Sequence, residues 1–69
     1  MGSLLRNTVQ LGTYLKVKDF FEKNKKKEFT AVDIRDELGI DYYSVKLTLS
    51  SLITEKFITK KENKYVREK

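Results

Sequence analysis

Two lysine-rich stretches carry the side chains best suited to chemistry, and that chemistry is the binding of anions. One stretch is the run of three lysines at residues 25–27, and the other comprises Lys60, Lys61 and Lys64 near the C-terminus. Lysine ammonium groups bind phosphate oxygens, and the affinity that such contacts give falls as the salt concentration rises. The two stretches therefore favour a phosphate backbone or another acidic partner, although lysine-rich surfaces also keep small proteins soluble.

The chain lacks the side chains that most enzymes and metal sites use. It contains no histidine and no cysteine, which removes the commonest general base, the commonest metal ligand and any disulfide. Its 69 residues make one small domain with little room for a deep pocket. We therefore expect no catalysis, no cofactor and no metal. No apolar run approaches the ~20 residues of a membrane span, so we expect no membrane partner and a cytoplasmic or nucleoid-associated protein.

The net charge of +5 is unevenly distributed along the chain. Residues 1–28 and residues 56–69 each carry a net charge of +4, whereas residues 29–55 carry −3. The basic flanks are therefore the expected phosphate-binding parts. The acidic centre instead favours contact with a protein.

The spacing of apolar residues predicts the elements that position these charges. Val17, Phe20 and Phe21 fall on one side of a first helix over residues 14–24, for which Thr13 is the expected N-cap. Gly12 is expected to prevent this helix from extending toward the N-terminus. Asn24 suits a left-handed residue at its C-terminal end.

Residues 34–58 carry the pattern of two helices joined by a tight turn. A short strand at Phe29 precedes Thr30, which caps the second helix in a capping-box-like pattern with Asp33. Gly39 supplies the C-terminal cap of that helix. Two helices joined by a short turn that contains glycine are typical of a helix-turn-helix.

The third helix begins at Asp41 and is expected to run to Lys56. The Asp41 side chain is a good N-cap, because its oxygens can accept the free backbone N–H groups of the first turn. Val45, Leu49 and Leu52 lie on one face of this helix and are expected to be buried.

A β-hairpin is predicted over residues 57–67. Two β-prone runs are separated by Glu62 and Asn63, and asparagine tolerates the positive φ that such turns need. Ile58 and Tyr65 would face the core. The basic residues that would gather at the tip and outer face are Lys60, Lys61, Lys64 and Arg67.

The residues that mark these elements most clearly are Phe29-Thr30, Asp33-Ile34, Leu38-Gly39-Ile40-Asp41, Ser44-Val45, Leu49, Leu52 and Phe57-Ile58. In this order they resemble the winged helix-turn-helix superfamily of bacterial, archaeal and viral DNA-binding regulators. The resemblance implies an α+β, mainly α fold of three helices and a C-terminal hairpin wing, in the order helix, strand, helix, helix, strand, strand. Residues 13–69 would form this domain, and residues 1–12 would form an N-terminal arm or a disordered end.

The resemblance also implies double-stranded DNA binding for transcriptional regulation, with the third helix in the major groove and the wing on phosphates. The implied groove-facing residues are Tyr42, Tyr43, Ser44, Lys46, Leu47 and Ser50. The implied phosphate contacts are Lys60, Lys61, Asn63 and Lys64 in the wing and Lys25, Lys26 and Lys27 in the linker. The groove-facing set has none of the Arg, Gln or Asn side chains that make bidentate base contacts, so we expect the flanks to supply most of the affinity.

The chain departs from the family pattern at Lys56, where glycine usually precedes Phe57. A left-handed lysine costs about 1 kcal/mol relative to glycine, which favours a turn built in another way. Arg35 is expected to be structural and to pair with an acid such as Asp36 or Asp41.

Other functions stay open from the sequence. The acidic centre and a surface of Tyr43 and Leu47 favour a protein-interaction domain, and a basic wing also suits RNA or a replication origin. The helical wheel places Leu47 opposite the buried stripe, so we expect it to face solvent. Residues 1–24 are the expected interface if the chain forms a homodimer.

Overall fold

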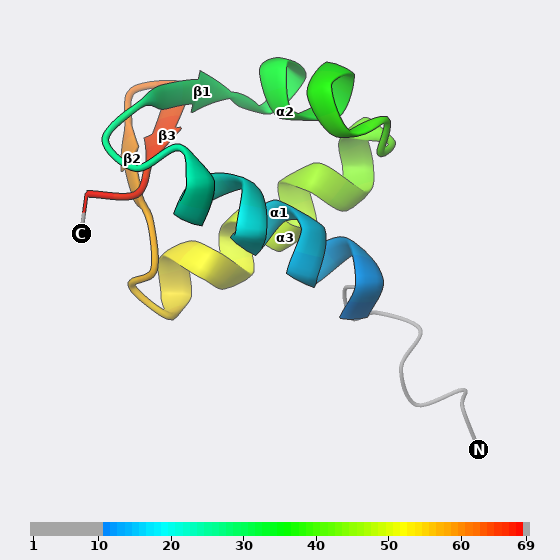
Figure 1. Cartoon of the computed structure of the whole chain (residues 1–69), viewed down its shortest axis with the longest axis horizontal. Coiled ribbons are helices and arrows are strands. Elements are labelled where there is room, and N and C mark those ends of the chain that lie inside the picture. The colour runs from blue at the N-terminus through cyan, green and yellow to red at the C-terminus, as the bar shows by residue number, and fades with distance from the viewer. Residues whose placement is uncertain (1–10, 69) are drawn as a thin grey trace.

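The computed structural model describes residues 11–68, and these contain three helices and a three-stranded antiparallel sheet (Figure 1). The elements are α1 (Leu11–Lys23), β1 (Glu28–Thr30), α2 (Ala31–Leu38), α3 (Tyr42–Thr54), β2 (Thr59–Lys61) and β3 (Lys64–Val66). This is an α+β, mainly helical fold with a winged-helix-like layout. The predicted fold class and element order are confirmed.

The sheet lies at one end of the molecule, beside α2, and α1 and α3 cross next to it (Figure 1). Its strand order is β1-β3-β2. Phe29 and Lys60 both pair with Tyr65 of the central strand. The β2–β3 hairpin therefore forms a wing whose inner strand is held by β1.

The core contains the stripes that the periodicity predicts. The buried apolar side chains are Val17, Phe21, Ala31, Ile34, Val45, Leu49, Leu52, Ile58, Tyr65 and Val66. One polar side chain joins them, since Thr48 is fully buried and its hydroxyl donates to the Ser44 carbonyl oxygen at 2.9 Å. That bond satisfies a hydroxyl that would otherwise be buried without a partner.

The predicted caps of α2 and α3 are confirmed. The Thr30 and Asp33 side chains form a reciprocal capping box, and Gly39 ends α2 with φ 68°. At the start of α3, the Asp41 carboxylate accepts hydrogen bonds from the Ser44 backbone N–H at 3.0 Å and the Ser44 hydroxyl at 2.8 Å. These bonds lower the pKa of Asp41 below its ordinary value of 3.8.

The lowered pKa makes the cap of α3 sensitive to acid. Because the folded-state pKa is depressed, Asp41 stabilises the fold above its unfolded-state pKa and loses this effect as pH falls through the folded-state value. Asp41→Asn keeps a capping oxygen but removes the charge. We expect the variant to unfold at lower urea concentration than the wild type at pH 7, and the two midpoints to converge below pH 3.8. Midpoints that stay equally far apart at every pH would contradict this assignment.

The start and end of α1 differ from the prediction. The helix already includes Leu11 and Gly12, so Thr13 is not its N-cap. A glycine in a helix interior costs only about 1 kcal/mol, which the packing of the following residues can offset. At the other end, Lys26 rather than Asn24 has positive φ, at 69°. Asn24 instead donates through its side-chain amide to the Phe20 carbonyl oxygen at 2.8 Å.

The turn at the end of α3 contains a lysine at the position where the sequence pattern led us to expect glycine. Lys56 adopts the left-handed conformation, with φ 64°, so the expectation of a differently built turn is wrong. Its backbone N–H donates to the Ile53 carbonyl, and the next N–H, of Phe57, donates to that of Leu52, both at 2.9 Å. These are the two bonds of a Schellman motif, which satisfy carbonyls at a helix end.

The same geometry predicts a stabilising substitution. Lys56→Gly removes the steric cost of a left-handed residue and should raise the free energy of unfolding by about 1 kcal/mol. For a domain of this size that corresponds to a rise in Tm of ~4–8 °C. Lys56→Ala keeps a Cβ and serves as the control, for which we expect no comparable gain in thermal unfolding experiments.

The hairpin turn also differs in detail. Glu62 has positive φ, at 58°, and Asn63 does not. Primed hairpin turns place a positive φ at their first central residue, so the turn type overrides the preference of the asparagine side chain.

Candidate nucleic-acid interface

One cleft of about 150 Å³ lies between the start of α2, the first half of α3 and the wing. Its lining residues are Thr30, Ala31, Val32, Tyr42, Lys46, Lys60, Asn63 and Tyr65. Four of them, Tyr42, Lys46, Lys60 and Asn63, are predicted site residues. Tertiary structure therefore brings part of the helix-three set and part of the wing set to one place.

Tyr65 lies at the centre of this arrangement. Its side chain is 4% exposed, and its hydroxyl accepts a hydrogen bond of 3.4 Å from the Lys46 ammonium. The Lys60 ammonium lies 5.9 Å from the centroid of the same ring, within cation–π range. Two ammonium groups from separate elements are thus held around one buried phenol.

The cleft differs in charge from three other concave surfaces of the molecule. Its lining contains two lysines and no carboxylate. The groove between α1 and α2 has Lys16 and Lys23 beside Asp19 and Glu37. The concavity on the outer face of the sheet has Lys26 and Lys61 beside Glu28 and Glu68, and that at the end of α3 has Glu55 and no lysine. An anion in this cleft therefore meets two ammonium groups and no carboxylate among the lining residues.

The pleat of the wing separates lysines that were expected to gather. Lys60 pairs with Tyr65, whereas Lys61 pairs with Lys64. Because successive residues of a strand face opposite sides of the sheet, Lys60 points to the Tyr65 side and the other two lysines point away. Lys61 is also neutralised there by Glu68 at 2.8 Å, and this hydrogen bond raises the pKa of Lys61.

The lysine linker does not reach the cleft. Residues 25–27 precede Glu28, which pairs with Val66 at the end of the sheet remote from the wing turn. Lys25 forms an ion pair with Glu22 at 3.5 Å. The Lys26 backbone N–H donates to the Arg67 carbonyl at 2.8 Å. The side chains of Lys25, Lys26 and Lys27 are exposed, but none of the three lines the cleft.

The remaining residues of the predicted helix-three set are scattered. Ser44 is half-buried and bonded to Asp41 through both its N–H and its hydroxyl, so it supports the cap. Ser50 is exposed but lines the concavity at the far end of α3. Leu47 is half-buried rather than solvent-facing. Side chains four residues apart are neighbours on a helix, and Tyr43, 70% exposed, is placed to cover part of it.

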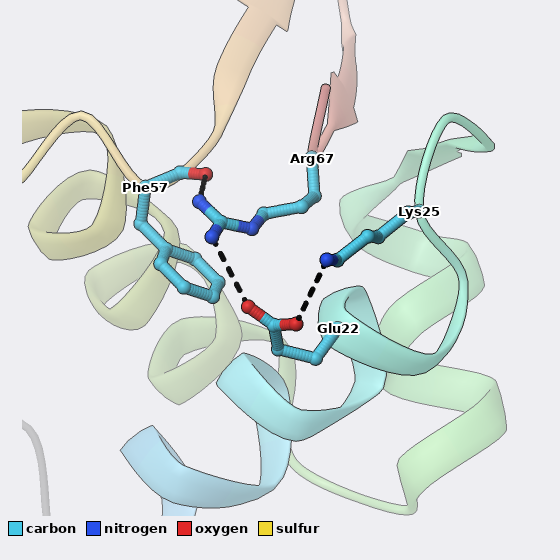
Figure 2. Close-up of polar contacts among 4 residues, drawn as sticks. All are labelled: Glu22, Lys25, Phe57 and Arg67. Carbon is cyan, nitrogen blue, oxygen red and sulfur yellow. Dashed lines mark hydrogen bonds and ion pairs between the residues drawn. The ribbon is translucent and has the colours of Figure 1, made fainter. Parts of the chain in front are cut away.

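Arg67 was expected on the outer face of the wing but lies at its base (Figure 2). Its side chain is 19% exposed, and its guanidinium carbon lies 3.7 Å from the centroid of the Phe57 ring. One terminal nitrogen donates to the Phe57 carbonyl at 2.7 Å, and the other contacts Glu22 of α1 at 3.1 Å. The planar guanidinium can stack and donate in this way, which a lysine cannot.

Figure 2 also shows that Glu22 binds Lys25 through its second oxygen. Arg67, Glu22, Phe57 and Lys25 therefore form one cluster, which we call the wing latch. It joins the base of the wing to α1 and the linker. Arg35, by contrast, pairs locally with Asp36 at 3.0 Å, as predicted for a structural residue.

Two features of functional interest were not predicted from the sequence. One is the position of the Tyr65 hydroxyl beside Lys46. The other is the part that Arg67 takes in the wing latch. The hairpin register could have drawn attention to Tyr65. Once Glu62 and Asn63 are taken as the turn, Tyr65 lies opposite Lys60. No comparable local signal exists for Arg67, because its partner Glu22 is far away along the chain.

The predicted homodimer interface is described only in part. Within α1, Leu11 and Leu15 are 70% and 51% exposed, and they lie one turn apart on the helix surface. The N-terminal arm, as far as residue 10, lies outside the described residues. A dimer through residues 1–24 remains a prediction.

A comparison with known proteins finds no match to this chain among protein-family models, curated proteins or solved structures. Within residues 11–68, no helix has the length and apolar character needed to cross a membrane. The same residues form no cluster of acidic side chains arranged to hold a metal ion. The function is therefore inferred from the geometry and charge of the cleft.

Proposed function

We propose that the chain is a non-catalytic protein that binds double-stranded DNA and acts in transcriptional control. The observation that carries this proposal is the cleft between α3 and the wing, where Lys46 and Lys60 line the surface without a carboxylate. A wing beside a helix can follow the DNA backbone while the helix enters the major groove. The two lysines then contact phosphate, and the exposed start of α3 faces the bases.

Phosphate contacts would supply most of the affinity. At the start of α3, Tyr42 and Tyr43 are 45% and 70% exposed, and their hydroxyls can bind phosphate or base edges. Neither side chain makes the bidentate base contacts of arginine, glutamine or asparagine. We therefore expect a modest preference among DNA sequences and a strong dependence of affinity on salt.

A protein-interaction domain is the second candidate, and the exposed Tyr43 favours it. Aromatic residues are enriched at protein interfaces. The surface expected for this function also needs Leu47, which is half-buried. The exposed apolar area at the start of α3 is therefore smaller than the sequence analysis suggested. DNA binding is the better-supported proposal. Binding of RNA or a replication origin would use the same cleft.

A salt series with labelled duplex DNA of random sequence tests the proposal. Binding is measured by fluorescence anisotropy from low to physiological salt, and log K is plotted against log salt. We expect a slope of at least two ions, because each neutralised phosphate contributes about 0.9 to the slope. Absence of binding at low salt would exclude DNA as the partner. Duplex RNA of the same length, used as competitor, tests the RNA alternative. Tighter binding to RNA than to DNA would identify RNA as the partner.

A further inference from the structure

The phenol of Tyr65 is placed to do more than fill the core. It belongs to the core cluster and also lines the cleft, and its hydroxyl accepts a hydrogen bond from Lys46, another lining residue. A hydroxyl oxygen that accepts a hydrogen bond from an ammonium keeps its own proton for another acceptor. The lining of the cleft contains no carboxylate that would take the proton.

The groups around this hydroxyl suit one phosphodiester. Lys46 approaches from α3 and Lys60 from β2, and both are held around the same ring. Asn63 adds an amide from the wing turn. Ammonium, amide and hydroxyl groups thus converge from α3, from both strands of the wing and from its turn, and a phosphate group presents several acceptor oxygens at once.

We propose that Lys46, Lys60 and Tyr65 together hold a single backbone phosphodiester in the cleft, with the Tyr65 hydroxyl donating a hydrogen bond to it. This inference rests on the proposed nucleic-acid binding. The inference adds that the wing and α3 together form one site that holds a single phosphate. The buried tyrosine is then both a direct ligand and the residue that positions the two lysines, and the site fixes how far α3 enters the groove.

Tyr65→Phe tests the role of the hydroxyl, because it keeps the buried ring and the total charge. We expect duplex affinity to fall roughly tenfold at every salt concentration, as is typical for a lost hydrogen bond to a charged group. The slope of log K against log salt should not change, because no counterion-releasing charge is lost. Tyr14→Phe removes the same atom from α1, outside the cleft, and should leave duplex affinity unchanged.

The outcomes separate this inference from the proposed function. Unchanged affinity of Tyr65→Phe, with wild-type binding intact, overturns the one-phosphate site and leaves DNA binding in place. A variant that loses affinity together with slope also overturns it, because the hydroxyl would then act only through the lysines. Thermal unfolding of the variant is measured in parallel, so that a folding defect is recognised.

A second measurement does not depend on DNA. Inorganic phosphate is titrated into isotope-labelled protein, and backbone amide shifts are followed by NMR. We expect the largest shifts at Val32 and Asn63 in the wild type and smaller shifts in Tyr65→Phe. If the wild type fails to bind duplex but shows these shifts, the phosphate site stands and its ligand is a free phosphate. If neither ligand binds, the site is excluded.

Discussion

The double substitution Lys46→Ala/Lys60→Ala is expected to weaken duplex binding roughly 50-fold at ~0.1 M salt and to lower the salt slope by about one, because both lysines contact the same phosphodiester. Both ammonium groups lie in a cleft whose lining has no carboxylate, so no lining carboxylate competes with the phosphate for them. The loss should be similar on every DNA sequence, because phosphate contacts carry no sequence information. Fluorescence anisotropy over the same salt series measures the change.

The control removes two lysines from another surface. Lys16→Ala/Lys23→Ala lowers the net charge equally, but these residues line the groove between α1 and α2 beside Asp19 and Glu37. We expect less than a threefold effect, since only long-range attraction is reduced and salt screens it beyond ~10 Å. Equal losses in the two double variants would mean that net charge, rather than the cleft, attracts DNA.

A comparison within the wing tests the separation of its two faces. Lys61 and Lys64 lie on the face away from Tyr65, and Lys61 is paired with Glu68. Lys61→Ala/Lys64→Ala should therefore cost less affinity than the Lys46/Lys60 pair. A larger loss would restore the sequence-based expectation that all the wing lysines act together.

Arg67→Ala is expected to lower the free energy of unfolding by about 2 kcal/mol. The change removes the hydrogen bond to the Phe57 carbonyl, the stacking on its ring and the contact with Glu22. For a domain of this size the predicted fall in Tm is ~8–16 °C. Urea and thermal unfolding followed by circular dichroism measure it.

Two further variants divide the latch into its parts. Arg67→Lys keeps the charge but loses the planar fork, so we expect most of the destabilisation to remain. Glu22→Gln keeps the shape of the partner and removes only its charge, which should cost less. If Arg67→Lys were as stable as the wild type, charge alone would hold the wing base, and the stacking on Phe57 would contribute nothing.

The elements and their caps could be predicted because they depend on neighbours in the chain. The capping box of Thr30 and Asp33 and the cap of Asp41 on Ser44 each join residues three positions apart. Gly39 needs only its own lack of a side chain to adopt positive φ. The helical stripes follow from a fixed period of 3.6 residues. Local sequence therefore determined the winged-helix-like order of helices and strands.

Local preference was insufficient where a tertiary or turn constraint opposed it. Gly12 lies inside α1, and Lys56 and Glu62 take left-handed conformations. At Lys56 the Schellman bonds and the adjoining Phe57 hold the backbone in place. An isolated residue preference of about 1 kcal/mol is easily exceeded by such contacts.

The site itself was decided by the tertiary structure. The sequence identified the basic flanks and marked Lys46, Lys60 and Asn63 as candidates, but it could not separate free lysines from paired ones. Lys46 meets Tyr65 across 19 positions, and Arg67 meets Glu22 from the opposite end of the domain. Such contacts depend on the packing of α1 and α3 and on the pleat of the sheet. Composition alone gives the total charge of the chain. Which lysines stay unpaired depends on which carboxylates the fold brings near them.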